Sequence, residues 1–225
     1  MAAGLSVIIP CRNAAPYLAA TLASARTQSH PPDEIIVIDD GSTDASAAIA
    51  AAVPGVRLYR QPPLGIGAAR NAGLERAGGT LIAFLDADDL WPRDSLQCRL
   101  RALAAEPALD GVCGQVEQFL SPELAGQAIF AVPAQAMLAR LAGAMLLRRR
   151  VFDRVGRFDA ALTLGETIDL VARIAAAGLL IGAIGEVVLH RRIHGANTVL
   201  TQRAGQRDYL KILKAGLDRR RALVV

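Results

Sequence analysis

Aromatic residues are scarce in this chain of 225 residues, where Phe, Trp and Tyr together make up 4%. The core must therefore be filled by aliphatic side chains, and hydrophobic residues as a class reach 52%. The basic residues near the C-terminus have no aromatic residues between them, whereas a platform for stacked nucleobases needs both. The composition is typical of a globular protein and argues against a nucleic-acid partner.

Cysteine is also rare. The three cysteines, Cys11, Cys98 and Cys113, are odd in number and widely spaced, which fits neither a disulfide framework nor a zinc site. A strand expected from Leu5 leaves no room for a signal peptide. We therefore expect reduced thiols and a cytoplasmic protein.

Long hydrophobic runs are missing as well. The longest apolar stretch, residues 178–189, contains Glu186 and three glycines and is too short to span a bilayer. The net charge of +4 is modest, and its excess near the C-terminus is typical of a solvated helix end. Peripheral contact with the inner face of a membrane and a homodimer both remain open.

The first ninety residues alternate short apolar runs with helical patterns. Strands are predicted at residues 5–9, 34–38, 56–59 and 80–85. One helix is predicted to begin at Pro16, a second to follow a cap at Ser42 or Thr43, and a third to cover residues 67–77. This alternation indicates a mostly parallel sheet covered by helices on both faces. Ligands of such sheets bind beyond the carboxyl ends of the strands.

The second half is less regular. Helices are predicted at residues 92–105, 134–141, 166–177 and 201–219, and extended segments at 111–119, 144–147 and 180–189. No repeat or linker divides the chain. We expect one α/β domain over residues 1–225, with a nucleotide-binding half (1–90), an acceptor-facing part (91–197) and a C-terminal helix (198–225).

Two acidic clusters follow strands of the predicted sheet and should meet at one edge. Asp39 and Asp40 end the second strand, and residues 86–89, of which only Ala87 is not acidic, follow the fourth. Closely spaced carboxylates repel one another, and a hard divalent cation relieves the repulsion. For residues 86–89 taken alone, a cap of the following helix is about as good an explanation as a metal. A turn and a helix cap would also use residues 42–44, but they do not explain two adjacent carboxylates at the end of the second strand.

Together, several segments resemble the successive signatures of family 2 glycosyltransferases with the GT-A fold, a Rossmann-like nucleotide-diphospho-sugar transferase fold. They are SVIIPCRN (6–13), EIIVIDDGSTD (34–44), GAARNAG (67–73), FLDADD (84–89), RRRVFDRVGRFD (148–159) and HRRIHGAN (190–197). Each segment alone is weak, but their order, spacing and strand context match. Roughly residues 115–143 match nothing.

The resemblance implies a nucleotide-sugar donor, most simply a UDP-sugar, and a divalent metal, Mn²⁺ or Mg²⁺. The residues implied to bind the donor are Pro10, Arg12, Asn13, Asp39, Asp40, Arg70, Asp86, Ala87 and Asp88. Asp40 would pair with the base, and Arg12 stands where an aromatic residue often stacks on it. Arg70 would brace the acidic edge or form a structural ion pair. The metal ligands would be Asp88, Asp86 and His194, with inverting transfer as the mechanism.

The sequence departs from the family pattern at the position expected for the catalytic base. Family members usually carry Glu-Asp at the start of the helix that faces the acceptor, and here the sequence is Glu166-Thr167. A threonine cannot take a proton from a sugar hydroxyl near neutral pH, and a positioned base is worth roughly 10²–10⁴ in rate. Glu166 is the first substitute, Asp169 the second, and an acceptor that needs little activation is a third explanation.

Other functions are left open. The missing base favours a catalytically weak or inactive nucleotide-sugar-binding protein as the alternative to a transferase. The motif Gly65-Ile66-Gly67 is a poor dinucleotide fingerprint because it follows the third strand and has Arg70 at its last position. A sugar nucleotidyltransferase would need a Gly-rich basic loop after the first strand, which is missing. The acceptor is undefined: a glycan, a lipid-linked sugar, a peptide or a small molecule.

Overall fold

A computed structural model describes residues 4–124, 132–195, 197, 208–209 and 211–216 of the chain. Its centre is an eight-stranded sheet with the order β3-β2-β1-β4-β7-β5-β6, and β8 pairs with β5 off this path. The strands are β1 (Leu5–Cys11), β2 (Glu34–Asp40), β3 (Val56–Gln61), β4 (Leu81–Phe84), β5 (Gly111–Leu120), β6 (Met137–Leu138), β7 (Met145–Arg148) and β8 (Ile181–Ile193). The helices are α1 (Ala15–Arg26), α2 (Ser46–Ala51), α3 (Ile66–Arg76), α4 (Ser95–Ala105), α5 (Arg150–Val155) and α6 (Glu166–Ala176), with short 3₁₀ turns η1 (Pro122–Leu124) and η2 (Ala142–Ala144).

The first four strands are parallel, as predicted from their alternation with helices. β1 lies between β2 and β4, and β3 pairs with β2. β1 and β4 are buried along their whole length, because helices cover both faces of the sheet. This arrangement confirms the predicted α/β class with a helix-flanked sheet, and it brings the ends of β1, β2 and β4 to one edge.

β7 joins the second half of the chain to the first. It pairs antiparallel with both β4 and β5, so strands from both halves share one sheet. β8 runs parallel to β5 with two register shifts and ends at Ile193, four residues beyond the predicted extended segment. That extension carries the segment after Ile193 toward the end of β4.

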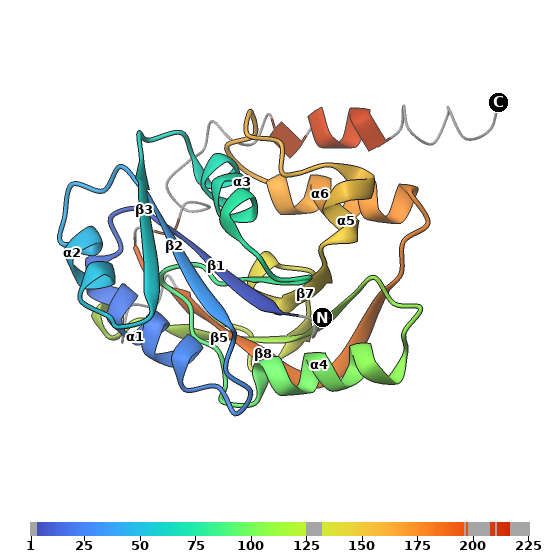
Figure 1. Ribbon diagram of the computed structural model, residues 1–225, viewed down its shortest axis with the longest axis horizontal. Helices are drawn as coiled ribbons and strands as arrows, with labels where there is room; N and C mark the ends of the chain where they lie inside the picture. The colour runs from blue at the N-terminus through green and yellow to red at the C-terminus, as the bar shows by residue number, and fades with distance from the viewer. Residues whose placement is uncertain (1–3, 125–131, 196, 198–207, 210, 217–225) are drawn as a thin grey trace.

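Helices α1 and α4 lie on one face of the sheet, and α3 and α6 lie on the other (Figure 1). A hydrophobic layer packs between the sheet and the helices on each face. On one face, Leu18, Leu22 and Leu96 of α1 and α4 pack against the strands. On the other, Leu74 of α3 and Leu170 of α6 do the same, beside a group of phenylalanines. Aliphatic side chains make up most of both layers, in line with the low aromatic content.

Three local predictions need correction. Residues 134–141 form no helix, because Met137 and Leu138 pair with the edge of β5 as strand β6 and this pairing overrides their helix propensity. The residue capping α2 is Ala45, not Ser42 or Thr43, and the backbone of Ser46 donates to Asp44 instead. Helix α5 was not predicted. It ends at Val155 and is followed by Gly156, whose φ of 78° suits glycine.

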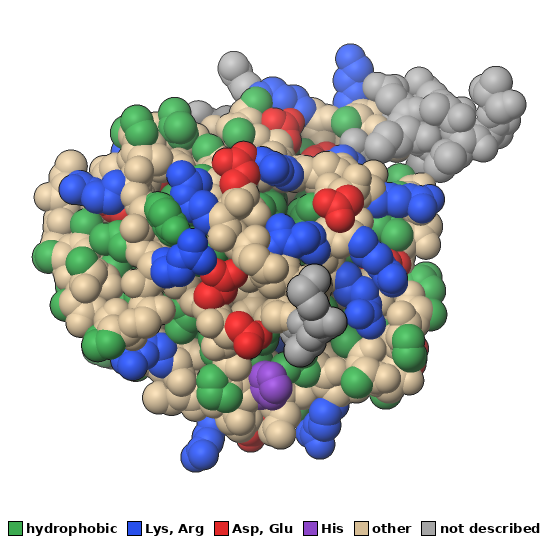
Figure 2. All heavy atoms as spheres, in the orientation of Figure 1, with side chains coloured by type: hydrophobic (Ala, Val, Ile, Leu, Met, Phe, Trp, Pro, Cys, Tyr) green, Lys and Arg blue, Asp and Glu red, His purple; other side chains and the backbone are tan. Residues whose placement is uncertain are grey.

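The helix predicted over residues 201–219 lies mostly outside the described residues. Within it, residues 208–209 and 211–216 are helical. None of the helices in the described part of the chain is long and apolar enough to cross a membrane. On the face shown in Figure 2, Lys and Arg side chains are interspersed with Asp and Glu, so the described residues form no broad area of one charge there.

Gly73 lets α3 lie close against β1. A Cβ at this position would stand 2.3 Å from Cγ2 of Ile8, a side chain that is fully buried. We expect Gly73→Ala to lower the free energy of unfolding by about 1–3 kcal/mol, because the rigid strand leaves the methyl group no space. Gly185→Ala is the control, since no atom lies within 4 Å of its Cβ position. Equal denaturant midpoints for the two variants would contradict this packing.

Candidate active site

A cleft of about 450 Å³ opens at the carboxyl ends of β1, β2 and β4. Its polar lining residues are Arg12, Asp40, Arg70, residues 86–89, Glu166, Arg191 and Asn197. Its apolar and aromatic lining residues include Leu64, Leu141, Ala160, Leu162, Leu164, Ile168 and Tyr209. The two acidic clusters that are 46 residues apart in sequence (Asp40 and Asp86) therefore border one cavity.

Asp40 holds the loop between β3 and α3. Its carboxylate accepts hydrogen bonds from the side chain of Gln61 at 2.7 Å and from the backbone N–H groups of Leu64 and Gly65 at 2.8 and 2.9 Å. Gly65 takes a φ of 95°, which suits glycine at this turn. Asp40 thus lies at the cleft as expected and fixes the wall that Leu64 and Gly65 form.

Asn13 and Asp39 lie behind the cleft wall and support it. The Asn13 side chain accepts from the backbone N–H of Thr43, and the Asn13 backbone donates to Ser42, so the loops after β1 and β2 are tied together. Asp39 is fully buried and accepts from Arg60 and from the Ser42 N–H. Neither residue lines the cavity, whereas Pro10, Arg12 and Ala87 do.

Arg70 connects two of the carboxylates that line the cleft. Its guanidinium donates to Asp86 at 2.7 Å and to Glu166, while only 2% of its side chain is exposed. Burial by itself would lower the pKa of Arg70, but the charges of Asp86 and Glu166 outweigh it and raise that pKa above its ordinary value. The cation therefore links the end of β4 to the start of α6.

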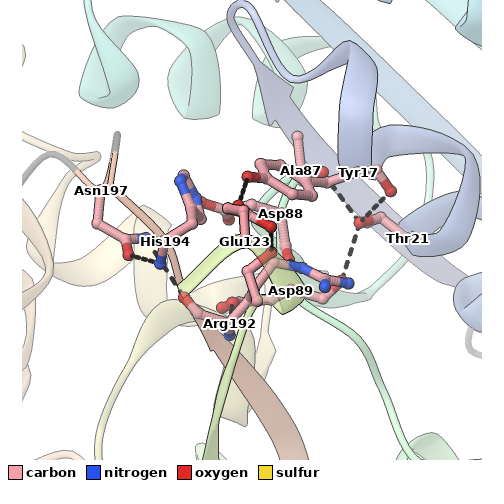
Figure 3. A network of polar contacts seen from close by, with 10 residues as sticks. Tyr17, Thr21, Ala87, Asp88, Asp89, Glu123, Arg192, His194 and Asn197 are labelled. Carbon is pink, nitrogen blue, oxygen red and sulfur yellow. Dashed lines mark hydrogen bonds and ion pairs between the residues drawn. The ribbon is translucent and has the colours of Figure 1, made fainter. Parts of the chain in front are cut away.

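The turn of residues 86–89 meets the end of β8 (Figure 3). Nε2 of His194 lies 2.9 Å from Oδ2 of Asp88. Asp89 points inward and accepts from the backbone N–H of Arg192 at 2.8 Å. Burial, together with the charges of Asp88 and Asp86, raises the pKa of Asp89 well above its ordinary value. Asp88 therefore faces the cleft and His194, and Asp89 anchors the turn.

The start of α6 places Glu166 at the cleft and Asp169 away from it. The hydroxyl of Thr167 donates to Glu166 at 3.0 Å. Asp169 accepts from Arg173 at 2.8 Å, and Arg173 also donates to backbone carbonyls at the end of α5. Asp169 is not among the residues that line the cavity. Of the two proposed substitutes for the base, the cleft contains Glu166.

The side chains at this site offer the oxygen and nitrogen atoms that a divalent cation needs as ligands. Asp88 offers carboxylate oxygen at the cleft, and Asp86 keeps 34% of its side chain exposed there. His194 does not line the cleft, but it offers imidazole nitrogen directly beside Asp88. The described residues contain no group of three or more His, Cys, Asp or Glu side chains already arranged around a metal position. Any further ligands would come from the diphosphate and water, as is common for Mg²⁺-type ions.

Several residues at the site could not be identified from sequence patterns. Tyr17 and Thr21 belong to an ordinary helical pattern, yet the Thr21 hydroxyl donates to the carbonyls of Ala87 and Asp89 at 2.9 Å each. Tyr209 lines the cleft from the far end of the chain. Arg192 was noted only as part of a motif, and its Nε donates to the carbonyl of Asp88 at 2.9 Å.

Comparison with known proteins gives this site its context. The model of the family described as Glycosyl transferase family 2 matches residues 6–156. The succinoglycan biosynthesis protein ExoO of Rhizobium meliloti is 31% identical over 195 residues, covering 77% of this chain and 56% of that protein. The uncharacterized glycosyltransferase YibD of Escherichia coli is 43% identical over 111 residues, covering 47% of this chain and 32% of its own length. The matches thus span between about a third and just over half of these relatives.

Solved structures share the fold. Residues 1–349 of TarS from Staphylococcus aureus, in complex with UDP-GlcNAc, superpose with a TM-score of 0.78 at 19% identity, covering 96% of this chain and 66% of that TarS fragment. The mannosyltransferase PcManGT of Pyrobaculum calidifontis, in complex with GDP-Man and Mn²⁺, superposes with a TM-score of 0.66 at 23% identity. The match covers 87% of this chain and 59% of PcManGT. Because the family model covers well over half of the sequence, this chain belongs to glycosyl transferase family 2, and its architecture is the GT-A fold.

Proposed function

We propose that this chain transfers a sugar from a nucleotide-sugar donor to an acceptor by direct, inverting displacement. One observation carries the proposal: Asp88, paired with His194, and Asp86, paired with Arg70, border a single cleft that Glu166 also lines. Carboxylates that could hold a diphosphate through a cation and a carboxylate that could accept a proton thus surround one cavity. The membership of the family supports the same reaction class.

The donor is proposed to lie against the polar residues of the cleft, with its nucleotide toward β1 and β2. Arg12 is exposed at the end of β1, and a guanidinium can stack on a base or contact phosphate. The carboxylate of Asp40 lies at the same cleft, where it can also meet a base N–H. Structural neighbours crystallised with UDP, UDP-GlcNAc and GDP-Man support a nucleoside diphosphate, and we propose a UDP-sugar.

Asp88, Asp86 and His194 are proposed to hold a divalent metal, Mn²⁺ or Mg²⁺. When bound, such a cation stabilises the negative charge that grows on the departing diphosphate. The neighbour that contains Mn²⁺ supports this assignment. The chain's own contribution is to orient Asp88 through the imidazole of His194 and Asp86 through the guanidinium of Arg70.

Glu166 is proposed to take the proton from the acceptor. It lines the cleft at the first turn of α6, near the exposed apolar residue Ile168, and the acceptor would lie there. Its ion pair with Arg70 orients the carboxylate. Asp169 remains the second choice, because its pair with Arg173 keeps it outside the cleft.

Calorimetry with UDP, with and without Mn²⁺, tests the proposal together with an assay of UDP release from UDP-sugars. We expect UDP to bind at least about tenfold more tightly with Mn²⁺, because a bound cation would offset the repulsion between the diphosphate and the carboxylates of Asp86 and Asp88. GDP serves as the comparison for the base. If no nucleoside diphosphate binds with any divalent metal, the proposed function is wrong.

A second candidate is a protein that binds nucleotide sugars without transferring them. Thr167 favours it, because the position where relatives of this kind usually carry the base has no carboxylate. Metal-dependent UDP binding with no turnover across many acceptors, and no donor hydrolysis, would support this candidate over the transferase.

A further inference from the structure

Tyr17 of α1 lies outside the cleft and yet contacts the side chains that face Asp88. We propose that Tyr17 is a positioning residue for the donor site, because its ring fixes the side chains of His194 and Arg192 against the turn of residues 86–89. The inference rests on the proposed function, since it concerns how the pair of Asp88 and His194 is oriented. Figure 3 shows these side chains converging from α1, the end of β8 and the end of β4.

The first contact is between two rings. The centroids of Tyr17 and His194 are 4.6 Å apart, with the planes tilted by 37°. The His194 side chain is only 7% exposed, and its Nε2 lies 2.9 Å from Oδ2 of Asp88. The backbone N–H of His194 donates to Asn197 at 2.6 Å. A ring that is packed on one side and hydrogen-bonded at its edge keeps one orientation, so Tyr17 helps to aim Nε2 at Asp88.

The second contact is a guanidinium between two rings. The Arg192 guanidinium lies 5.0 Å from the centroid of Tyr17 and 4.6 Å from that of Phe119. Its Nε donates to the carbonyl of Asp88 at 2.9 Å. Cation–π contacts of this kind contribute most when the cation is shielded from water, and Arg192 is buried. The stack therefore holds the backbone of Asp88, as the imidazole holds its carboxylate.

Tyr17 itself is anchored. Its hydroxyl donates to Glu123 at 2.6 Å, and the Ser121 hydroxyl donates to the other oxygen of Glu123. Hydrogen bonds from Ser121 and Tyr17 lower the pKa of Glu123 to about 2, so the acceptor stays ionised at neutral pH. One helical turn further along α1, Thr21 holds the same turn of residues 86–89 through two carbonyls. α1 thus braces the acidic turn from behind.

The test separates positioning from simple packing. Tyr17→Leu removes the ring, Tyr17→Phe keeps it without the hydroxyl, and Tyr59→Leu on β3 is the control, since Tyr59 packs near Arg57 and Arg76. The two readouts are nitrogen-15 NMR of the histidine rings, with His30 as reference, and calorimetric UDP binding with and without Mn²⁺. Neither readout is turnover.

We expect Tyr17→Leu to shift the His194 ring resonances, leave those of His30 unchanged, and weaken Mn²⁺-dependent UDP binding about tenfold. UDP binding without metal should stay the same, because Tyr17 does not line the cleft. The metal-dependent UDP affinity of Tyr17→Phe should stay within about threefold of the unmodified protein. Combining Tyr17→Leu with His194→Ala should cost less than the two single losses added together, because part of the effect of Tyr17 passes through His194.

Unchanged His194 resonances in Tyr17→Leu overturn the proposal, as does an equal loss of UDP binding with and without metal. If the unmodified protein binds no nucleoside diphosphate with any divalent metal, the proposed function fails. The His194 resonances of Tyr17→Leu then still decide whether Tyr17 orients the imidazole.

Discussion

Replacing Asp88 by asparagine should reduce sugar transfer at least about 10²-fold while the protein stays folded. Asp88 combines exposure at the cleft with a hydrogen bond to His194, and its side chain is 27% exposed. Asparagine keeps the shape but removes the charge that would hold a cation beside the diphosphate. The melting temperature should change little, because Asp89, and not Asp88, forms the buried anchor of the turn.

Asp94→Asn is the matched control for this experiment. Asp94 lies on the same connection after β4, is exposed, and makes no capping hydrogen bond to α4. It should keep full activity and full metal-dependent UDP binding. Sugar transfer by Asp88→Asn at the rate of Asp94→Asn would remove the basis for a metal at this position. Asp88→Ala should behave like Asp88→Asn.

Replacing Arg70 by methionine should both destabilise the protein and abolish activity. Methionine fills the space but leaves Asp86 and Glu166 without their shared cation. Removing one partner of a buried ion pair lowers the free energy of unfolding by about 3–5 kcal/mol, because the remaining charge is left without a partner. Activity should fall as well, since the same guanidinium orients carboxylates on the donor and acceptor sides of the cleft. Chemical denaturation and a donor-turnover assay measure the two effects.

A double variant makes the Arg70 prediction sharper. Adding Glu166→Gln to Arg70→Met should recover part of the lost stability, because it removes one of the stranded carboxylates, whereas two independent losses would add. Arg76→Met is the control: Arg76 is on the same helix, exposed, and stacks on Tyr59 at 4.7 Å. Arg76→Met should lower the free energy of unfolding by less than about 1 kcal/mol. If Arg70→Met unfolds at the denaturant concentration of Arg76→Met, the ion pairs do not bear the stability assigned to them.

These two predictions share one physical origin. The acidic residues at the ends of β2 and β4 are held by different partners: backbone amides for Asp40, a guanidinium for Asp86, an imidazole for Asp88, and a further amide for Asp89. Each partner leaves its carboxylate with a different exposure and a different function. A cluster that appears uniform in the sequence is thus divided into structural and cleft-facing members.

The predicted helix at residues 134–141 shows where local sequence is insufficient. Its Ala, Met and Leu residues favour a helix, but β5 presents an open edge, and residues 137 and 138 satisfy it as β6. Asp169 is a second case, because its spacing from Glu166 is compatible with the cleft. The side chain of Arg173 holds it toward α5 instead. Both outcomes depend on groups distant from the local pattern.

What the sequence by itself determined is the order of the first strands and helices, the parallel sheet, and the edge where Asp40 and Asp86–Asp89 meet. Apolar runs of strand length and the parallel connection rule are local or nearly local properties, so the sequence contains them. Only the tertiary structure decided that Arg70 connects Asp86 with Glu166, that Asp89 turns inward, and that the ring of Tyr17 packs against that of His194. Those contacts join residues 16 to 177 positions apart, and their geometry exists only after the sheet has brought the segments together.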